Sequence, residues 1–381
     1  MRLPPFQLER YFAAHEFSAP HLLSASDSES MTVAELLELE PGAAERLLGL
    51  RLGYTETAGG PALREAIAAG YGTLDADRVL VHSGGEEAVF TFMNAVLEPG
   101  DHVIVHAPCY QSLWQLPVSL GCEVTDWRVR AGDGWALDLD FLRGALRQDT
   151  RLVVVNAPHN PTGYAPPPDV WEELVATVDG HGAILLADEA YRGLEYRRDA
   201  RLTAACDLSS RAVSLGLTSK GLGLPGLRVG WIATRDTGIL EAAARTRDYV
   251  TICGSGPSEL LAELALRHRE RILDRNREIA LANLERLRSF MDRHRAHFTW
   301  EPPRAGPITF PTYLGEEGAE AFCRRALEGA GVLLLPGTVF EPESRELRIG
   351  FGRRGFPAAL EALEEFLAGE PPPAVRDPDR G

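Results

Sequence analysis

Residues 214–231 read SLGLTSKGLGLPGLRVGW, and they contain Lys220, the only lysine in a chain of 381 residues. Every other residue among the 39 Lys+Arg is an arginine, so a sequence bias has replaced surface lysines. A guanidinium serves at a surface much as an ammonium does, but it stays protonated and cannot form a Schiff base with an aldehyde. The retained primary amine therefore indicates covalent amine chemistry at Lys220.

The same stretch contains a Gly-x-Gly-x-x-Gly pattern within residues 221–226. In a dinucleotide-binding loop this pattern is followed by a helix, whereas residues 229–232 (VGWI) have the composition of a strand. We therefore interpret the glycines as a flexible loop that joins Lys220 to Arg228. Such a loop lets both side chains turn toward one small anionic ligand.

Short apolar runs rich in β-branched residues alternate with amphipathic stretches through the middle of the chain. The apolar runs are residues 79–81, 103–105, 152–155, 183–186, 212–215 and 229–233, and the amphipathic stretches include 87–96, 139–146 and 171–178. This alternation predicts an α/β fold, with a large domain in which a mostly parallel sheet lies between helices.

The pattern changes in the last third of the chain. Residues 257–293 read as one long helix, and they are followed by strand candidates at 308–310, 332–335 and 347–349 and by helical stretches at 319–330 and 357–368. We expect a smaller α+β domain there. The divisions are a segment 1–45 that contributes to the small domain, a large domain 46–250, a small domain 251–369 and a disordered tail 370–381.

Composition narrows the class of protein. Hydrophobic residues make up 45% and charged residues 25%, as in soluble globular proteins. A net charge of −16 without a basic run argues against nucleic acid and anionic membranes as partners. The N-terminus lacks the apolar core of a signal peptide, and no run reaches the roughly 20 apolar residues of a membrane span.

Cysteine and histidine usage points away from disulfides and metals. Five cysteines lie far apart with no Cys-x-x-Cys pair, which argues against a disulfide framework or a thiolate zinc site and favours the reducing cytoplasm. His102 and His106 share one face of a strand, but no third ligand follows at metal spacing. We therefore expect no metal.

Three polar segments follow predicted strands, where open α/β sheets bind ligands. Ser83-Gly84-Gly85 opens a helix whose free N–H groups and dipole favour phosphate, although an ordinary strand-to-helix turn reads the same way. Asn160 stands in a turn made rigid by two prolines. Asp188 leaves a strongly apolar strand, so burying it requires a cation such as a protonated pyridine nitrogen, unless it only caps the next helix.

In order along the chain, these segments resemble the class I/II aminotransferases, the fold type I pyridoxal 5′-phosphate (PLP) enzymes. The resemblance extends from about Tyr54 to Gly352. It includes Gly59, Leu63-Arg64, Ser83-Gly84-Gly85, Pro99-Gly100-Asp101, Pro108-Cys109-Tyr110, the Asn-Pro-Thr-Gly of 160–163, the Asp-Glu-Ala-Tyr of 188–191, Lys220, Arg228 and Arg348. It implies that residues 46–250 bind PLP and that the N-terminal segment covers the active site.

The resemblance also implies catalytic roles. Lys220 would hold PLP as an internal aldimine and, once released, would act as the general base that moves a proton at the substrate's Cα. Asp188 would keep the pyridine nitrogen protonated. Asn160 and Tyr191 would hydrogen-bond the phenolic oxygen, and Tyr110 would stack on the ring.

The remaining implied roles concern the phosphate and the substrate. Arg228 would hold the phosphate. Ser83, Gly84, Gly85 and Ser219 would assist it. Tyr54 would reach the phosphate of a neighbouring subunit, which implies a homodimer with shared active sites. Arg348 would bind the substrate's α-carboxylate, and the other residues expected at the substrate are Asn160, Ser26 and Asp27.

Two departures from the family pattern affect the functional prediction. Leu217 stands where many relatives have a hydroxyl that touches phosphate, so Thr218, Ser219 or Arg228 has to compensate. Residues 22–30, expected over the substrate, differ from those of aspartate and aromatic aminotransferases. Several acids crowd the N-terminal segment, and they could meet a cationic substrate side chain; they are Glu9, Glu16, Asp27 and Glu29.

We expect a PLP-dependent aminotransferase that acts on an amino acid through a Cα carbanion. The alternative is a PLP-dependent lyase or cyclase that performs β- or γ-elimination, replacement or ring closure in specialised metabolism, as in the similar capreomycidine synthase-like cyclases of guanidino amino acids. A regulator built on this scaffold would carry an additional basic DNA-binding domain, and the sequence has no room for one.

Overall fold

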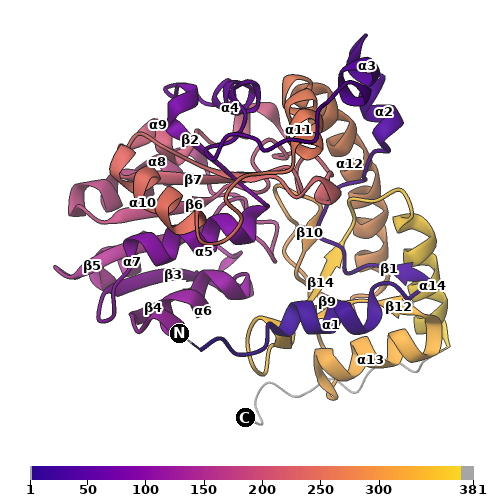
Figure 1. Ribbon diagram of the computed structural model, residues 1–381. Helices are drawn as coiled ribbons and strands as arrows, with labels where there is room; N and C mark the ends of the chain where they lie inside the picture. Colours follow the sequence, from indigo (N-terminus) through magenta and orange to yellow (C-terminus); the bar gives the residue numbers. More distant parts are fainter. Residues whose placement is uncertain (1, 370–381) are drawn as a thin grey trace.

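A seven-stranded sheet lies at the centre of the computed structural model, which describes residues 2–369 (Figure 1). The strand order is β2-β8-β7-β6-β5-β3-β4. β8 (Gly230–Thr234) pairs antiparallel with both of its neighbours, and every other pair in the sheet is parallel. The other strands are β2 (Val79–His82), β3 (His102–Ala107), β4 (Glu123–Arg128), β5 (Thr150–Asn156), β6 (Ile184–Asp188) and β7 (Ala212–Leu217).

The sheet is covered on both faces, which explains its continuous apolar strands. On β5, Leu152 and Val154 pack in the same core cluster as residues of α5, α6 and α10, whereas Val153 and Val155 pack with residues of α7, α8 and α9. Successive side chains of a strand point to opposite faces, so a strand between two helix layers must be apolar throughout. These helices are α5 (Gly85–Val96), α6 (Gln111–Leu120), α10 (Thr237–Arg247), α7 (Leu139–Ala145), α8 (Pro168–His181) and α9 (Ala205–Leu208).

A second core lies in a smaller α+β lobe built from the C-terminal third of the chain and part of the N-terminus. β1 (His21–Leu22) pairs in parallel with β12 (Val332–Leu333), which places the N-terminal segment in this lobe. A three-stranded sheet has the order β10-β14-β13. The lobe contains β9 (Phe298–Thr299), β10 (Ile308–Thr309), β11 (Thr312–Tyr313), β13 (Leu335–Pro336), β14 (Leu347–Gly350), α13 (Gly318–Ala330) and α14 (Phe356–Ala368).

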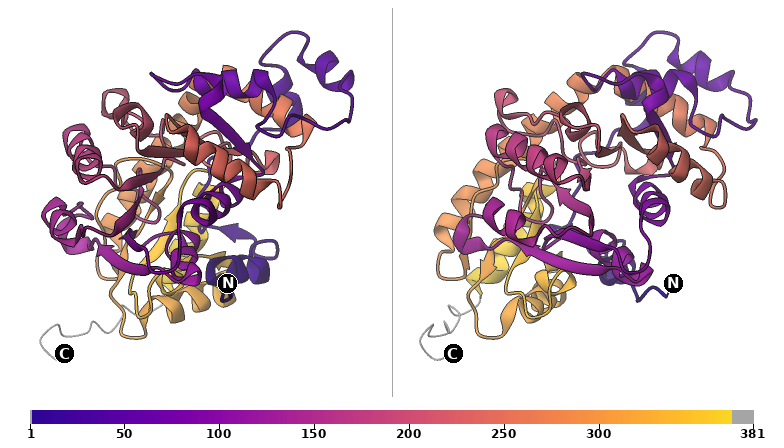
Figure 2. Two further views of the ribbon diagram at one scale, coloured as in Figure 1. Left: turned by 60° about the vertical axis from the view of Figure 1, so that its left-hand side comes forward. Right: turned by 90° about the vertical axis from the view of Figure 1, so that its left-hand side faces the viewer.

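The remaining helices connect or flank the lobes. α1 (Gln7–His15) lies beside the small lobe, and α2 (Val33–Leu37) and α3 (Ala43–Leu48) project at one end of the molecule next to α11 (Figures 1 and 2). α4 (Pro61–Ala68) packs on α11. None of the helices within residues 2–369 combines the length and apolar composition that a bilayer crossing needs. The predicted disordered tail, 370–381, lies outside the described residues.

The prediction of one helix over 257–293 was wrong, because the structure has α11 (Gly256–Arg267) and α12 (Arg269–Arg293) with a break at His268. Neither glycine nor proline marks the break. Instead Arg267 and His268 both reach Glu40, at 3.0 and 3.4 Å, and Arg269 donates to the carbonyl of Ala66. These tertiary contacts override a locally helical sequence.

The prediction also missed β4. This edge strand, EVTDWR, has only Trp127 buried, so it lacks the continuous apolar run that identified the inner strands. Polar residues on an edge strand are a common protection against pairing with another chain.

Residues 23–29, which we call the strap, run from the small lobe to the loop that carries Lys220. The strap is held by backbone hydrogen bonds, because the amide of Gly350 donates to Leu23, that of Glu29 to Gly352, and that of Ser28 to Lys220. A Cβ on Gly350 would lie 1.6 Å from the carbonyl oxygen of Ala25, so only glycine allows this approach.

We predict that Gly350→Ala will displace the strap and lower the free energy of unfolding by about 1–3 kcal/mol, the usual cost of overpacking. Gly355→Ala is the control, because no atom lies within 4 Å of its Cβ position; its effect should stay within about 0.5 kcal/mol. Denaturant unfolding and hydrogen exchange over residues 22–30 measure the two effects. Equal stability and equal exchange in both variants would contradict this account of the strap.

Candidate active site

One edge of the central sheet gathers most of the polar residues singled out from the sequence. Parallel strands end at the same edge, so the end of β6 carries Asp188 to it, and the segments after β2, β5 and β7 carry Gly84, Asn160 and Lys220. β8 runs in the opposite direction, and Arg228, two residues before it, therefore returns to this edge. As predicted, a strand rather than a helix follows the glycine loop.

The amine of Lys220 is buried and donates a hydrogen bond to the hydroxyl of Ser26, with Nζ and Oγ 2.8 Å apart. Burial lowers the pKa of this amine, the charge of Arg348 lowers it further, and Asp27 opposes both effects. A lowered pKa increases the fraction of neutral amine, which is the form that acts as a nucleophile or a base.

Asp188 is the last residue of β6, and its carboxylate accepts from the backbone amide of Ala190 at 3.1 Å. Burial raises the pKa of Asp188 to about 6, while the Ala190 amide and the charge of Lys220 act in the opposite direction. A carboxylate held so far above its usual pKa is stabilised by a cationic partner.

A small cradle lies between Arg228 and the first turn of α5. Gly84 has φ 95°, and a Cβ there would lie 2.6 Å from Nη2 of Arg228; a Cβ on Gly230 would lie 2.6 Å from the carbonyl carbon of Gly84. Arg228 itself has φ 52°, and its Nη1 donates to Pro225 at 3.1 Å. Glycine thus keeps open a space that a guanidinium and a helix N-terminus favour for an anion.

The neighbours of this cradle limit which hydroxyl can assist Arg228. The hydroxyl of Thr218 is directed at the carbonyls of Leu224 and Val229, 3.3 and 3.2 Å away. This leaves Ser219 as the hydroxyl that could compensate for Leu217. Burial also raises the pKa of Glu86, which accepts from Ser112, to about 7, and this reduces its repulsion of an anion.

Arg348 lies on β14 with 1% of its surface exposed. Its Nη1 donates to Oδ1 of Asn160 at 3.0 Å and its Nη2 to the carbonyl of Ser24 at 2.7 Å, whereas its Nε has no hydrogen-bond partner within residues 2–369. Burial lowers the pKa of this guanidinium. A buried cation held only by neutral groups and carrying an unused N–H fits the carboxylate of a ligand.

The sequence interpretation missed the side chains that hold this edge together. Asn156, at the end of β5, accepts from the amide of Asn160 at 2.6 Å and donates to the carbonyl of Asp188 at 2.9 Å. His159 bonds to Thr162 and to the carbonyl of Pro108, at 2.8 and 2.7 Å. The available signal was an asparagine ending an otherwise apolar strand.

The strap and α1 supply further groups. Tyr191 donates to the carbonyl of Ser26 at 2.9 Å, and Tyr110 donates to Glu9 at 2.5 Å. Both carboxylate oxygens of Asp27 accept from Arg353, at 3.0 and 2.9 Å. Asp27, expected at the substrate, is therefore already neutralised by a cation.

Other candidates lie apart from this edge. Tyr54 is 94% exposed, so the single chain does not bring it into the site. His102 bonds to Thr150 and Thr125, and His106 stacks on His159. No group of three or more His, Cys, Asp or Glu positioned for a metal ion occurs in the described part of the chain.

Comparison with known proteins defines the family. The family model described as "Aminotransferase class I and II" matches residues 22–362. Capreomycidine synthase of Streptomyces vinaceus is 34% identical over 373 residues, which covers 96% of this chain and 94% of that enzyme. The chain belongs to the class I and II aminotransferase family.

Two solved structures agree with this assignment. A PLP-dependent aminotransferase from Streptococcus suis has a TM-score of 0.91 and 32% identity, with 97% of this chain and 98% of that one covered. The PLP-dependent cyclase OrfR has a TM-score of 0.89 and 34% identity, with the same coverage. The predicted fold, an enzyme, and PLP as cofactor are confirmed at the level of the family.

The residues at the sheet edge fit PLP. The cradle beside Gly84 and Arg228 is open only because glycine stands there, and it suits a phosphate. Asp188 forms no ion pair within residues 2–369 and keeps a raised pKa despite the charge of Lys220, and a protonated pyridine nitrogen would supply a cationic partner in direct contact. The amine of Lys220 would contact the aldehyde group of PLP.

We predict that PLP affinity depends on the ionisation of Asp188. Its pKa is about 6 in the cofactor-free protein against the usual 3.8, so the carboxyl is ionised above about pH 6 and loses its charge below it. Affinity should therefore fall as the pH drops through 6, by up to about tenfold per pH unit. Fluorescence titration with PLP measures this loss in the wild type.

The phosphate of PLP also titrates near pH 6, so the Asp188→Asn variant separates the two contributions. Asp188→Asn should bind PLP more weakly at pH 8 and show a smaller pH dependence. An unchanged pH profile in that variant would refute the assignment of Asp188.

Proposed function

We propose that this protein is a PLP-dependent aminotransferase that acts on an α-amino acid with a cationic side chain. The observation that carries the proposal is the convergence of the only lysine in the chain, its amine buried and its pKa lowered, with Asp188 and Arg348 at one sheet edge. Family membership supports the reaction class.

Each residue at this edge has a defined task in the proposal. Arg348 binds the substrate's α-carboxylate through its guanidinium, and Asn160 fixes the orientation of that guanidinium. Bound PLP supplies an electron sink for the negative charge that develops at the substrate's Cα. Lys220 removes the proton from the substrate's Cα and delivers it to the carbon of the cofactor that carried the aldehyde. The hydroxyl of Ser26 orients the amine of Lys220.

The remaining side chains hold the cofactor. Asp188 keeps a cationic nitrogen charged, and Arg228 with the amides of Gly84 and Gly85 binds a phosphate. Ser83 and Ser219 flank that phosphate site. In the proposal, Tyr191 and Asn160 contact the phenolic oxygen, and Tyr110 covers the ring. This is supported by the hydrogen bonds of Tyr191 with Ser26 and of Asn160 with Arg348.

Glu9 supports a cationic substrate side chain. Within residues 2–369, its carboxylate accepts a hydrogen bond only from the hydroxyl of Tyr110, and its charge acts on both Lys220 and Arg348. By contrast, Asp27 is bound by Arg353, and Glu29 accepts the amide of Arg354. Of the acids near the strap, Glu9 therefore has negative charge available for a substrate.

We predict that Lys220→Arg and Lys220→Ala will each lower kcat by at least about 100-fold, the lower range for loss of a general base. Borohydride reduction followed by peptide mass spectrometry should find the cofactor on Lys220 in the wild type and nowhere in the variants. Methylamine should partly restore Lys220→Ala, because it supplies the missing amine. Normal turnover by Lys220→Arg would end the proposal.

A panel of amino acids, incubated with the PLP-loaded enzyme without a keto acid, identifies the reaction. Transamination should convert the cofactor to pyridoxamine phosphate and release a 2-oxo acid in equal amount. Release of ammonia, or a cyclised amino acid with unchanged cofactor, would instead identify a lyase or cyclase.

That second function is favoured by one specific observation. The two comparisons at 34% identity over nearly the whole chain are capreomycidine synthase and the cyclase OrfR. A cyclase would use the same Lys220, Asp188 and Arg348, because it also begins with loss of the Cα proton. It differs in the fate of the side chain, which lies toward the strap and α1.

We predict that Glu9→Gln will lower kcat/KM about 10- to 100-fold for the best cationic substrate of the panel, since a hydrogen bond to a charged group contributes about 1.5–3 kcal/mol. The neutral isostere, citrulline where the substrate is arginine, should change less than threefold. Glu16→Gln is the matched control on the same segment and should leave both unchanged. Equal losses for the charged and neutral substrates would contradict the role of Glu9.

The assembly and location are also proposals. An exposed apolar set near Tyr54 supports a homodimer with shared sites; it comprises Leu48, Leu52, Tyr54, Tyr249 and Ile252. The hydrogen bond from Thr55 to the carbonyl of Gly254 joins its two segments. Five free cysteines within the described residues support the cytoplasm. The domain boundaries at 45/46 and 250/251 stay predictions.

A further inference from the structure

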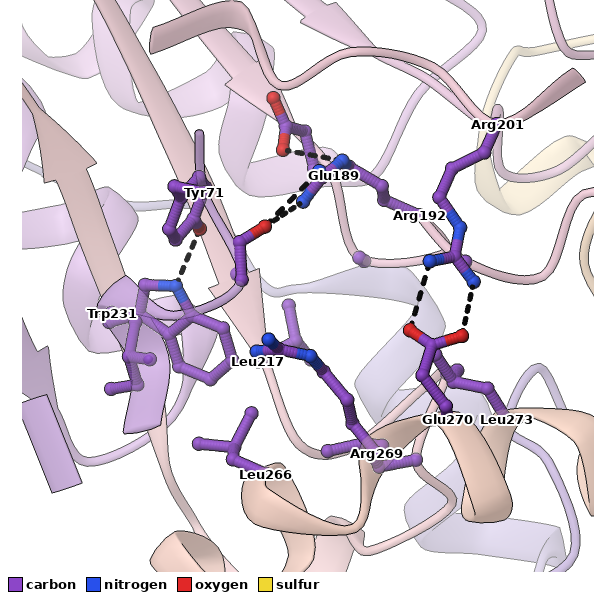
Figure 3. Close-up of a pocket in the computed structure, with 17 residues that line it drawn as sticks. Tyr71, Glu189, Arg192, Arg201, Leu217, Trp231, Leu266, Arg269, Glu270 and Leu273 are labelled. Atoms are coloured by element: carbon purple, nitrogen blue, oxygen red, sulfur yellow. Dashed lines mark hydrogen bonds and ion pairs between the residues drawn. The ribbon is translucent and has the colours of Figure 1, made fainter. Parts of the chain in front are cut away.

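A second cavity, of about 100 Å³, lies behind the loop that carries Lys220 (Figure 3). Its lining includes Gly216 and Leu217 before the lysine and Gly221 and Leu222 after it, but not Lys220 itself. Asp188, Arg228 and Arg348 are likewise absent from the lining, so this cavity is separate from the candidate active site. Its outer wall is formed by α11, α12 and the segment after α4.

The lining of the cavity contains three arginines and two carboxylates, so its charged groups include more cations than anions. Arg201 and Glu270 form a two-point ion pair at 2.9 and 3.1 Å, which neutralises both. Glu189 accepts from the amide of Ala205 and the hydroxyl of Ser214, and it stands 3.8 Å from Arg192. Within residues 2–369, Arg269 forms no ion pair with a carboxylate, and backbone carbonyls accept hydrogen bonds from its guanidinium.

Arg269 is the centre of this positive field. Figure 3 shows its side chain extending from α12 into the middle of the cavity, toward Leu217. Burial lowers the pKa of Arg269, the charge of Glu270 opposes this effect, and repulsion from Arg192 and Arg201 lowers the pKa further. Arg269 and Glu270 are the first residues of α12, so the helix dipole adds to the positive potential.

The opposite wall is apolar and rigid. Trp231 donates to the hydroxyl of Tyr71 at 2.8 Å, which fixes both rings at the edge of the cavity. The other apolar residues of the lining are Ile67, Leu217, Leu222, Leu266 and Leu273. The volume far exceeds the roughly 10–15 Å³ that a single water needs, so the cavity has room for a small organic molecule.

We propose that this cavity binds a small carboxylate with an apolar body, an aliphatic or aromatic monoanion, as a regulatory ligand. The carboxylate would lie at Arg269 and Arg192, and the apolar body would lie against Trp231, Leu266 and Leu273. The occupant would contact residues on both sides of Lys220 in sequence and would thereby restrict its loop. This inference does not depend on which reaction the active site performs.

Benzoate is the probe, titrated by calorimetry into the PLP-loaded protein, and benzamide is its neutral counterpart. We expect saturable benzoate binding, at least tenfold weaker binding of benzamide, and at least tenfold weaker benzoate binding by Arg269→Gln. Arg271→Gln, an exposed change two residues along α12, should bind benzoate as the wild type does.

Arg348→Gln distinguishes this cavity from the active site, since benzoate could also reach the carboxylate site there. Benzoate binding should persist in Arg348→Gln; its loss in that variant, equal binding by Arg269→Gln, or equal binding of benzamide would each overturn the proposal. So would the absence of saturable binding to the wild type. Arg201→Gln, which frees Glu270 to repel a carboxylate, should also weaken binding and replaces Arg269→Gln if that variant does not fold.

Discussion

The active site depends on burying ionic groups together at one apolar sheet edge. Isolated buried charges are costly, and the protein alone compensates these only in part. Burial lowers the pKa values of Lys220 and Arg348 and raises that of Asp188, so all three are shifted toward their neutral forms. In the proposed function, the cationic ring nitrogen of PLP and the carboxylate of the substrate would supply the missing counter-charges. The free-energy cost of these incompletely compensated charges in the empty site therefore favours binding of a ligand that compensates them.

The strap connects this edge to the small lobe. Ser24 accepts from Arg348 through its carbonyl, and Ser26 contacts both Lys220 and Tyr191. Arg348, Lys220 and Tyr191 thus all contact one segment near the N-terminus. The pair of Asp27 and Arg353, 326 residues apart in sequence, fixes the segment to the end of β14. Because the strap contacts both the amine of Lys220 and the guanidinium of Arg348, a change in the sequence of the strap would act on the two residues that the proposed function places at the substrate.

Much of the fold and the site could be predicted because the decisive signals are local. The apolar runs that end in Asp188 and Asn156 predict buried strands. The polar residue at the end of each run also predicts which edge of the sheet carries the polar groups. Contacts across long sequence separations left no such mark. The residues around His268 do not predict that a contact with Glu40 accompanies a helix break there. The residues around Asp27 likewise do not predict its ion pair with Arg353. The cavity at Arg269 is likewise absent from any motif, since it is formed by five separate segments meeting behind the Lys220 loop.

Comparison with the arginines of the chain explains what the single lysine can do that an arginine cannot. Where a charge has to meet a carboxylate, as in Arg201 with Glu270 or Arg353 with Asp27, the planar guanidinium makes two hydrogen bonds and serves better than an ammonium. At position 220 the requirement is the reverse. The group has to lose its proton in a buried site beside Arg348, and a guanidinium would stay charged there. The proposed function therefore explains why lysine is retained at position 220 in a sequence that has arginine at every other Lys or Arg position.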